Sequence, residues 1–197
     1  MLFNKSKNVP EPVASAGLSK WYEDLTDQDR IRLGRYLGGA DASSPAAFFV
    51  SVMRAADLDE NYAFAASISD HALSLRLDPY ERFTVAEASI DPLIGAGRTR
   101  EAKELCLGNL EAYPSVKDIV DRGPDGFPCR LECRNRLIDI MVGEESDYDG
   151  ADAMLERFFG MGLISAEELS LRRQSLKVRR LQRVFDSIFT LNKKEGQ

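Results

Sequence analysis

The chain of 197 residues has few of the side chains that metal sites and nucleophilic enzymes need. It contains one histidine, His71, and three cysteines. Cys129 and Cys133 are four residues apart and share a helical face, but a structural zinc site needs four ligands. The other two would have to be Cys106 and the remote His71, so packed thiols are favoured. No glycine-rich phosphate loop or nucleophile motif is present. We therefore predict a non-enzymatic chain without catalytic, cofactor-binding or metal-binding residues.

The chain also lacks long apolar runs. A membrane helix needs roughly 18 to 20 continuous apolar residues, and no stretch approaches that length. The apolar run at the start covers only residues 1–3, which is too short for a secretory leader. An odd number of cysteines in such a chain indicates a reducing compartment. We expect a cytoplasmic protein without membrane contact.

Basic residues are not in excess. Lysine and arginine number 26 against 32 acidic residues, so the formal net charge is −6. This balance argues against a wholly basic nucleic-acid-binding protein and leaves room for a local basic patch. The length suits one domain with a sizeable core.

No alternating strand pattern of useful length appears. Apolar residues instead recur three and four positions apart, which indicates helices. The predicted helices are 18–25, 26–37, 45–56, 60–77, 81–96, 98–113, 129–143, 147–162 and 165–192. Thr26 and Thr99 are predicted N-caps, Pro45 a first helical residue, and Ser165 with Glu168 a capping box. We expect one helical domain over 18–197, preceded by a flexible tail, 1–17.

Residues 95–114, GAGRTREAKELCLGNLEAYP, contain a turn glycine, a helical run and a closing proline. The small residue Ala102, the larger Cys106 and the terminal Pro114 stand at offsets that resemble the second half of a tetratricopeptide repeat. That family pairs antiparallel helices over about 34 residues, with the pattern W-x2-L-G-x2-Y, A-x3-F and P. The first half departs from it: Ala86, Ser89, Ile90 and Leu93 replace Trp, Leu, Gly and Tyr. Pro92 is expected to kink or interrupt this helix.

Two neighbouring stretches repeat the small residue. Ala65 lies 37 positions before Ala102, and Ala151 lies 49 positions after it. The second spacing exceeds the period by roughly 15 residues, which is about the length of 115–128, so we interpret that segment as an insertion. The predicted repeats are 45–79, 81–115 and 129–163.

The resemblance implies an all-α protein, an α–α superhelix of about three antiparallel helix pairs. N-terminal helices precede the pairs and a capping helix, 165–192, follows them. Stacked pairs bury the apolar faces that one pair alone would expose. A generic α-helical bundle with similar hairpins is the alternative.

Arginines mark a first candidate contact surface. Arg130, Arg134 and Arg136 crowd the first turns of helix 129–143, where the helix dipole disfavours cations. In the family that this chain resembles, the first helix of each pair lines a concave groove, and some members bind peptide carboxylates through basic residues there. The resemblance thus implies a partner-binding role for these arginines. The alternative is a solvated surface paired with Glu132 or with residues 144–146.

The second candidate surface is the C-terminal helix. Residues 170–183 hold six basic residues and no acid: Arg172, Arg173, Lys177, Arg179, Arg180 and Arg183. Leu171, Val178, Leu181, Phe185 and Ile188 gather on the opposite side at 100° per residue, and with Gln174 they follow an a/d heptad spacing. We expect this apolar seam to be buried on the last repeat, with the basic face in solvent. The alternatives are contact of the basic face with RNA or an acidic protein, and pairing with a second copy.

These features predict a non-catalytic scaffold or adaptor that binds a protein or peptide through a helix-lined surface. An RNA-binding or regulatory protein that uses the basic C-terminal helix is the alternative. A monomer and a homodimer through that helix both remain open.

Overall fold

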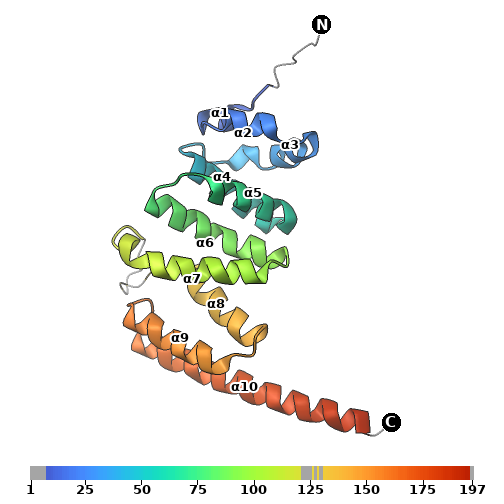
Figure 1. Ribbon diagram of the computed structural model, residues 1–197, viewed down its shortest axis with the longest axis vertical. Helices are drawn as coiled ribbons and strands as arrows, with labels where there is room; N and C mark the ends of the chain where they lie inside the picture. The colour runs from blue at the N-terminus through green and yellow to red at the C-terminus, as the bar shows by residue number, and fades with distance from the viewer. Residues whose placement is uncertain (1–7, 121–125, 127, 129–130, 196–197) are drawn as a thin grey trace. The chain divides into compact units, whose positions relative to one another are not determined.

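The computed structural model describes residues 8–120, 126, 128 and 131–195, with side chains up to residue 185. These residues form ten α-helices, one 3-10 turn and no β-strand (Figure 1). The predicted all-α class is therefore confirmed. The helices are α1 Glu11–Ser15, α2 Ser19–Asp24, α3 Asp27–Gly34, α4 Pro45–Leu58, α5 Tyr62–Ser74, α6 Pro79–Gly95, α7 Thr99–Val116, α8 Glu132–Gly143, α9 Tyr148–Gly160 and α10 Ala166–Glu195.

Contacts divide the chain into two compact units, Met1–Ile119 and Val120–Gln197. The boundary falls inside 115–128, the segment that we interpret as an insertion between the second and third repeats. The first unit holds α1 to α7 and the second holds α8 to α10. One continuous domain over 18–197 stays a prediction.

In the first unit, α4 to α7 pack as consecutive layers (Figure 1). α4 contacts α5 and α6, and α6 also contacts α5 and α7. The connections 59–61, 75–78 and 96–98 are short, and short connections place consecutive helices antiparallel. The pairs α4–α5 and α6–α7 therefore occupy the positions of the first two predicted repeats. Their membership of the tetratricopeptide family stays a prediction.

The core of the first unit is built on aromatic side chains of α4. Phe48 and Phe49 are fully buried, and the Trp21 ring meets Phe49 edge to face, with centroids 4.8 Å apart. This geometry is favourable beyond the area it buries. It draws the N-terminal helices onto α4, because Trp21 belongs to α2.

Residues 11–16 do not belong to a flexible tail. They form α1 and its C-cap, and Val13 and Ala16 are buried in the same core as α4. The prediction of a tail over 1–17 is therefore wrong for this stretch. A five-residue helix is too short to display a helical period in the sequence. The proline in its first turn is compatible with a helix start.

The helix ends confirm the predicted caps Thr26 and Ser165 and the first helical residue Pro45, whereas the Glu168 carboxylate of the predicted capping box pairs with Arg172. Thr26 and Ser165 accept hydrogen bonds from the backbone N–H groups of Asp29 and Glu168, at 3.1 Å each. Pro45 opens α4 as expected. Thr99 is not a cap: it is the first residue of α7, and its side chain makes no cap hydrogen bond. Pro92 and Pro114 lie inside α6 and α7, so neither interrupts its helix.

Two glycines shape the turn from α6 to α7. Gly97 has a φ of 77°, a left-handed conformation that glycine adopts without steric cost. Gly95 instead allows a close approach, because a Cβ there would lie 2.3 Å from the Tyr62 ring of α5. Arg98 then joins α7 to α5 by donating to both carboxylate oxygens of Asp70 at 2.9 Å.

The three alanines at the repeated small position are all fully buried. Ala65, Ala102 and Ala151 lie on α5, α7 and α9, the second helix of each predicted pair, and each is 0% exposed. A buried alanine lets the backbones of neighbouring helices approach closely, whereas a larger side chain would separate them.

Replacing Ala102 with Leu should therefore destabilise the fold. The added carbons meet a packed interface, so the free energy of unfolding should fall by about 1–3 kcal/mol. Urea denaturation followed by circular dichroism measures the change. Glu111→Leu, at an exposed position of the same helix, is the matched control and should change stability little. An Ala102→Leu protein as stable as the parent would show that the interface around Ala102 contains unfilled volume.

Candidate functional site

Two of the predicted groove arginines, Arg134 and Arg136, contact other residues of the second unit. Arg134 is only 9% exposed, and its Nη1 donates a hydrogen bond to the carbonyl oxygen of Leu163. Arg136 lies 3.9 Å from a carboxylate oxygen of Glu132 and of Asp139. Arg134 thus joins α8 to the segment that follows α9, and a partner-binding role for these arginines stays a prediction. Arg130 and Cys129 lie outside the described residues.

Arg173 of α10 binds two acids of α9. Its Nε and Nη2 donate to the two carboxylate oxygens of Asp152 at 2.7 and 2.8 Å, and its Nη1 pairs with Glu156. The bidentate form is the strong arrangement of such a pair. The two acids are four residues apart, so they lie on one face of α9. The hydrogen bond from Arg173 lowers the pKa of the Asp152 carboxyl below its usual range.

Three more arginines of α10 bind polar side chains of the same unit. The contacts are Arg172 with Glu168 at 2.7 Å and Asn135 at 2.8 Å, Arg179 with Asp139 at 3.3 Å, and Arg180 with Asp149 at 2.8 Å. Lys177 and Arg183 are exposed. The basic face is thus largely in solvent, as predicted, while four of its arginines also pair with residues of the same unit.

The apolar seam of α10 is exposed, so the prediction that it is buried is wrong. Leu171, Val178, Leu181 and Phe185 are between 57% and 61% exposed. Leu169 and Leu176 are buried instead, at 8% and 7%, and they lie between the arginines on the other side of the helix. The face that docks on α9 is therefore the one that carries the ion pairs. The Ile188 side chain is outside the described part of the chain.

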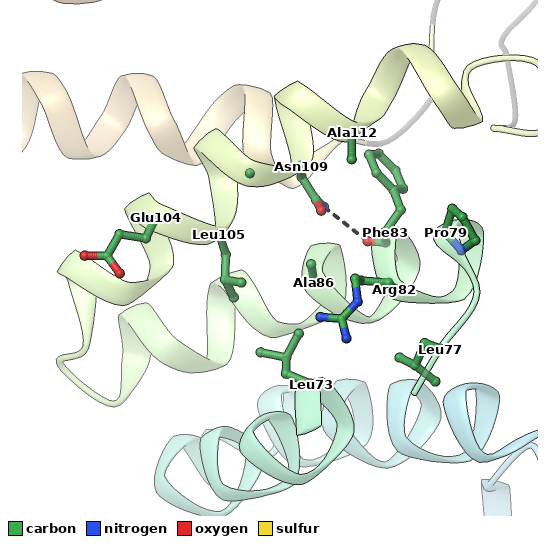
Figure 2. Close-up of a pocket in the computed structure, with 11 residues that line it drawn as sticks. Leu73, Leu77, Pro79, Arg82, Phe83, Ala86, Glu104, Leu105, Asn109 and Ala112 are labelled. Carbon is green, nitrogen blue, oxygen red and sulfur yellow. Dashed lines mark hydrogen bonds between the residues drawn. The ribbon is translucent and has the colours of Figure 1, made fainter. Parts of the chain in front are cut away.

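An apolar groove lies between α5, α6 and α7 of the first unit (Figure 2), and we call it the α5–α7 groove. Its volume is about 480 Å³, within the range of ligand-binding pockets. Figure 2 shows Leu73 and Leu77 along one edge and the α7 side chains along the other. Its apolar lining consists of Leu73, Leu77, Pro79, Phe83, Ala86, Leu105 and Ala112.

Polar side chains stand at defined places in this groove. Asn109 is buried and donates from Nδ2 to the carbonyl oxygen of Phe83 at 3.1 Å (Figure 2), which fixes α7 on α6. Arg82 is exposed beside Leu73, and its Nη2 donates to the Leu75 carbonyl oxygen at 3.2 Å. Glu104 is exposed on the other side of the groove. The groove thus combines an apolar wall with one cation and one anion.

Gly108 lines the groove from the middle of α7. A Cβ at this position would meet no atom within 4 Å, and the backbone is not left-handed. Neither packing nor conformation therefore requires glycine, although glycine inside a helix costs about 0.5–1 kcal/mol relative to alanine. Because glycine has no side chain, position 108 leaves space open in the groove.

The sequence alone does not predict this groove. Its lining comes from three helices and looks, in sequence, like ordinary apolar positions. The one available signal was a glycine inside a strongly helical run. A smaller hollow of about 390 Å³ lies between α4 and α6.

Among the described residues, the remaining chemistry-bearing ones are two buried cysteines and one exposed histidine, His71. Cys106 and Cys133 are buried, and the His71 ring meets the Trp21 ring at 5.8 Å. Within the part of the chain that the structure describes, no cluster of His, Cys, Asp or Glu has the composition of a metal site. No helix in that part combines the length and apolar character needed to cross a membrane.

Comparisons with protein families, with curated proteins and with solved structures each find no match for this chain. Function is therefore inferred from the geometry of the two surfaces above. They are the α5–α7 groove in the first unit and α10 in the second.

Replacing Asp152 with Asn should lower stability in a pH-dependent way. The native pKa of Asp152 lies below its usual value, so its pairing with Arg173 stabilises the fold above about pH 4, where the unfolded carboxyl is ionised. That contribution is lost as the pH falls through the native pKa. The pair is partly exposed, so the difference at pH 7 should not exceed about 1 kcal/mol.

Urea unfolding of both proteins between pH 2 and pH 7 tests this expectation. The exposed Asp118, changed to Asn, is the control and should give no comparable pH-dependent difference. A constant difference across this range would assign the effect of Asp152→Asn to packing.

Proposed function

We propose that this chain is a non-catalytic scaffold that binds a peptide segment of a partner protein in the α5–α7 groove. The observation that carries the proposal is the glycine at position 108, which keeps an apolar groove open without any structural need for glycine. Because the chain has few cysteines, we still expect a reducing cytoplasm as its location.

The composition of the groove supports a peptide as the ligand. Peptide-binding grooves between helices take apolar side chains as anchors and use a few polar groups to orient the chain. Here the leucines and Phe83 supply the anchoring wall. Arg82 and Glu104 lie apart along the groove (Figure 2), so an apolar segment with an acid toward Arg82 and a base toward Glu104 would complement them.

RNA binding by the basic face of α10 has less structural support than peptide binding in the α5–α7 groove. Phosphate binding requires cations that are available to replace counterions. Four of the six basic side chains of residues 170–183 instead bind acids of their own unit: Arg172, Arg173, Arg179 and Arg180. Binding to RNA would require them to exchange these partners.

Two substitutions of Gly108 should separate its effect on stability from its effect on peptide binding. Gly108→Ala should raise the free energy of unfolding by about 0.5–1 kcal/mol, because alanine is the better helix former. Gly108→Leu should fill the groove and weaken peptide binding by at least about ten-fold, or 1.4 kcal/mol, while the helix stays intact. Peptides selected from a random display library on the full chain, followed by calorimetric titration, measure this effect.

Glu111→Ala is the matched control. It is exposed on α7 outside the groove lining, so it should leave peptide affinity unchanged. Selected peptides that bind the Gly108→Leu protein as tightly as the parent would place the binding site elsewhere. If only single-stranded RNA binds, with affinity that falls steeply with salt and is the same in both proteins, the alternative function would replace this one.

A further inference from the structure

The exposed seam of α10 is an interaction surface that the proposed function does not use. Its four large side chains, Leu171, Val178, Leu181 and Phe185, are each more than half exposed. Contiguous apolar patches of roughly 300–600 Å² on a soluble protein commonly mark a contact site. The seam faces away from α9, because the opposite side of the helix carries the buried Leu169 and Leu176.

The spacing of the seam fits another helix. Leu171, Val178 and Phe185 follow one another at intervals of seven, with Gln174 and Leu181 between them, which is the a/d pattern of helices that wind around each other. The seam is straight along one helix and already ordered by the contacts of the other face. A partner helix would therefore meet a preformed surface, and preorganisation lowers the entropic cost of association.

We propose that the seam pairs in parallel with α10 of a second copy of this chain. Charges beside an a/d seam set partner choice, and the flanking positions here are Ser170, Ser175, Lys177, Gln182 and Val184, of which Lys177 alone is charged. In a parallel pair, Lys177 faces Gln182 of the other copy, so no like charges meet. Arg173, Arg179 and Arg180 pair with acids of α8 and α9, so they do not repel across the pair.

The side chains of the seam also match a two-stranded pair. A β-branched residue at a followed by leucine at d, here Val178 and Leu181, favours two parallel strands. Gln174 would meet its counterpart at a d position, and one polar pair in such a seam fixes register and strand number. The resulting interface uses the same patch on both copies and closes with two-fold symmetry.

The size of the patch predicts a reversible pair. The described seam contributes four large apolar side chains from each copy, few compared with the roughly 20–30 residues a side of a standard interface. We therefore expect a monomer–dimer equilibrium that shifts with protein concentration.

Sedimentation velocity of the full chain over a roughly hundred-fold concentration range tests the proposal. The parent chain should convert from monomer to dimer. Leu181→Glu should weaken association by at least about ten-fold, because a carboxylate would be buried in the seam. Gln174→Leu should tighten it, since an apolar side chain replaces the polar one. Circular dichroism should show unchanged helicity, because Leu181 and Gln174 are both exposed in a single copy.

Arg183→Glu is the control, since it introduces a carboxylate on the far side of the same helix and should leave the dimer intact. A parent chain that stays monomeric throughout would overturn the proposal and would assign the seam to another protein. Equal dimerisation of the parent and Leu181→Glu would place the interface elsewhere. Growth beyond two copies would exclude the closed pair. Peptide binding in the α5–α7 groove is measured separately, so either proposal can fail alone.

Discussion

A hairpin of two helices cannot bury its own apolar side chains, and this constraint governs the first unit. Each layer from α4 to α7 is covered by the next, and the close approach of layers depends on small residues at fixed places. Ala65 and Ala102 bring the backbones together, and Gly95 makes room for the Tyr62 ring. The N-terminal helices complete this arrangement, because Val13 and Trp21 pack against the outer side of the aromatic core.

In the second unit, ion pairs as well as apolar burial hold the last helix in place. Among the described side chains of α10, the buried apolar ones are Leu169 and Leu176, and arginines on either side of them pair with acids of α9. A bidentate contact to a carboxylate has a defined geometry, so Arg173 and Asp152 set the rotation of the helix. The more apolar side of α10 is left for another contact. The docked face thus combines ion pairs with two buried leucines, while the seam with four large apolar side chains is exposed.

Much of the fold can be predicted from the sequence, because helix ends and periods are local properties. Caps such as Thr26 and Ser165, and the small residue Ala102, depend on neighbours within a few positions. The candidate sites are different. The α5–α7 groove needs three helices to be placed before its lining can be recognised, and the orientation of α10 depends on acids up to 40 residues away, such as Asp139 for Arg179. A pattern of apolar residues shows that a helix has two unlike faces, but it does not show which face is turned inward.

The two faces of α10 should respond to ionic strength in opposite directions. Contacts such as Arg173 with Asp152 are weakened when salt screens them, since the Debye length falls from about 10 Å at 0.1 M to 3 Å at 1 M. Association of apolar surface is strengthened by salts such as sulfate that are excluded from proteins. As the concentration of such ions rises, the ionic contacts on one face of α10 therefore weaken, and association through its apolar face strengthens. The balance between internal docking and external contact at α10 would thus follow the osmotic and ionic state of the cell.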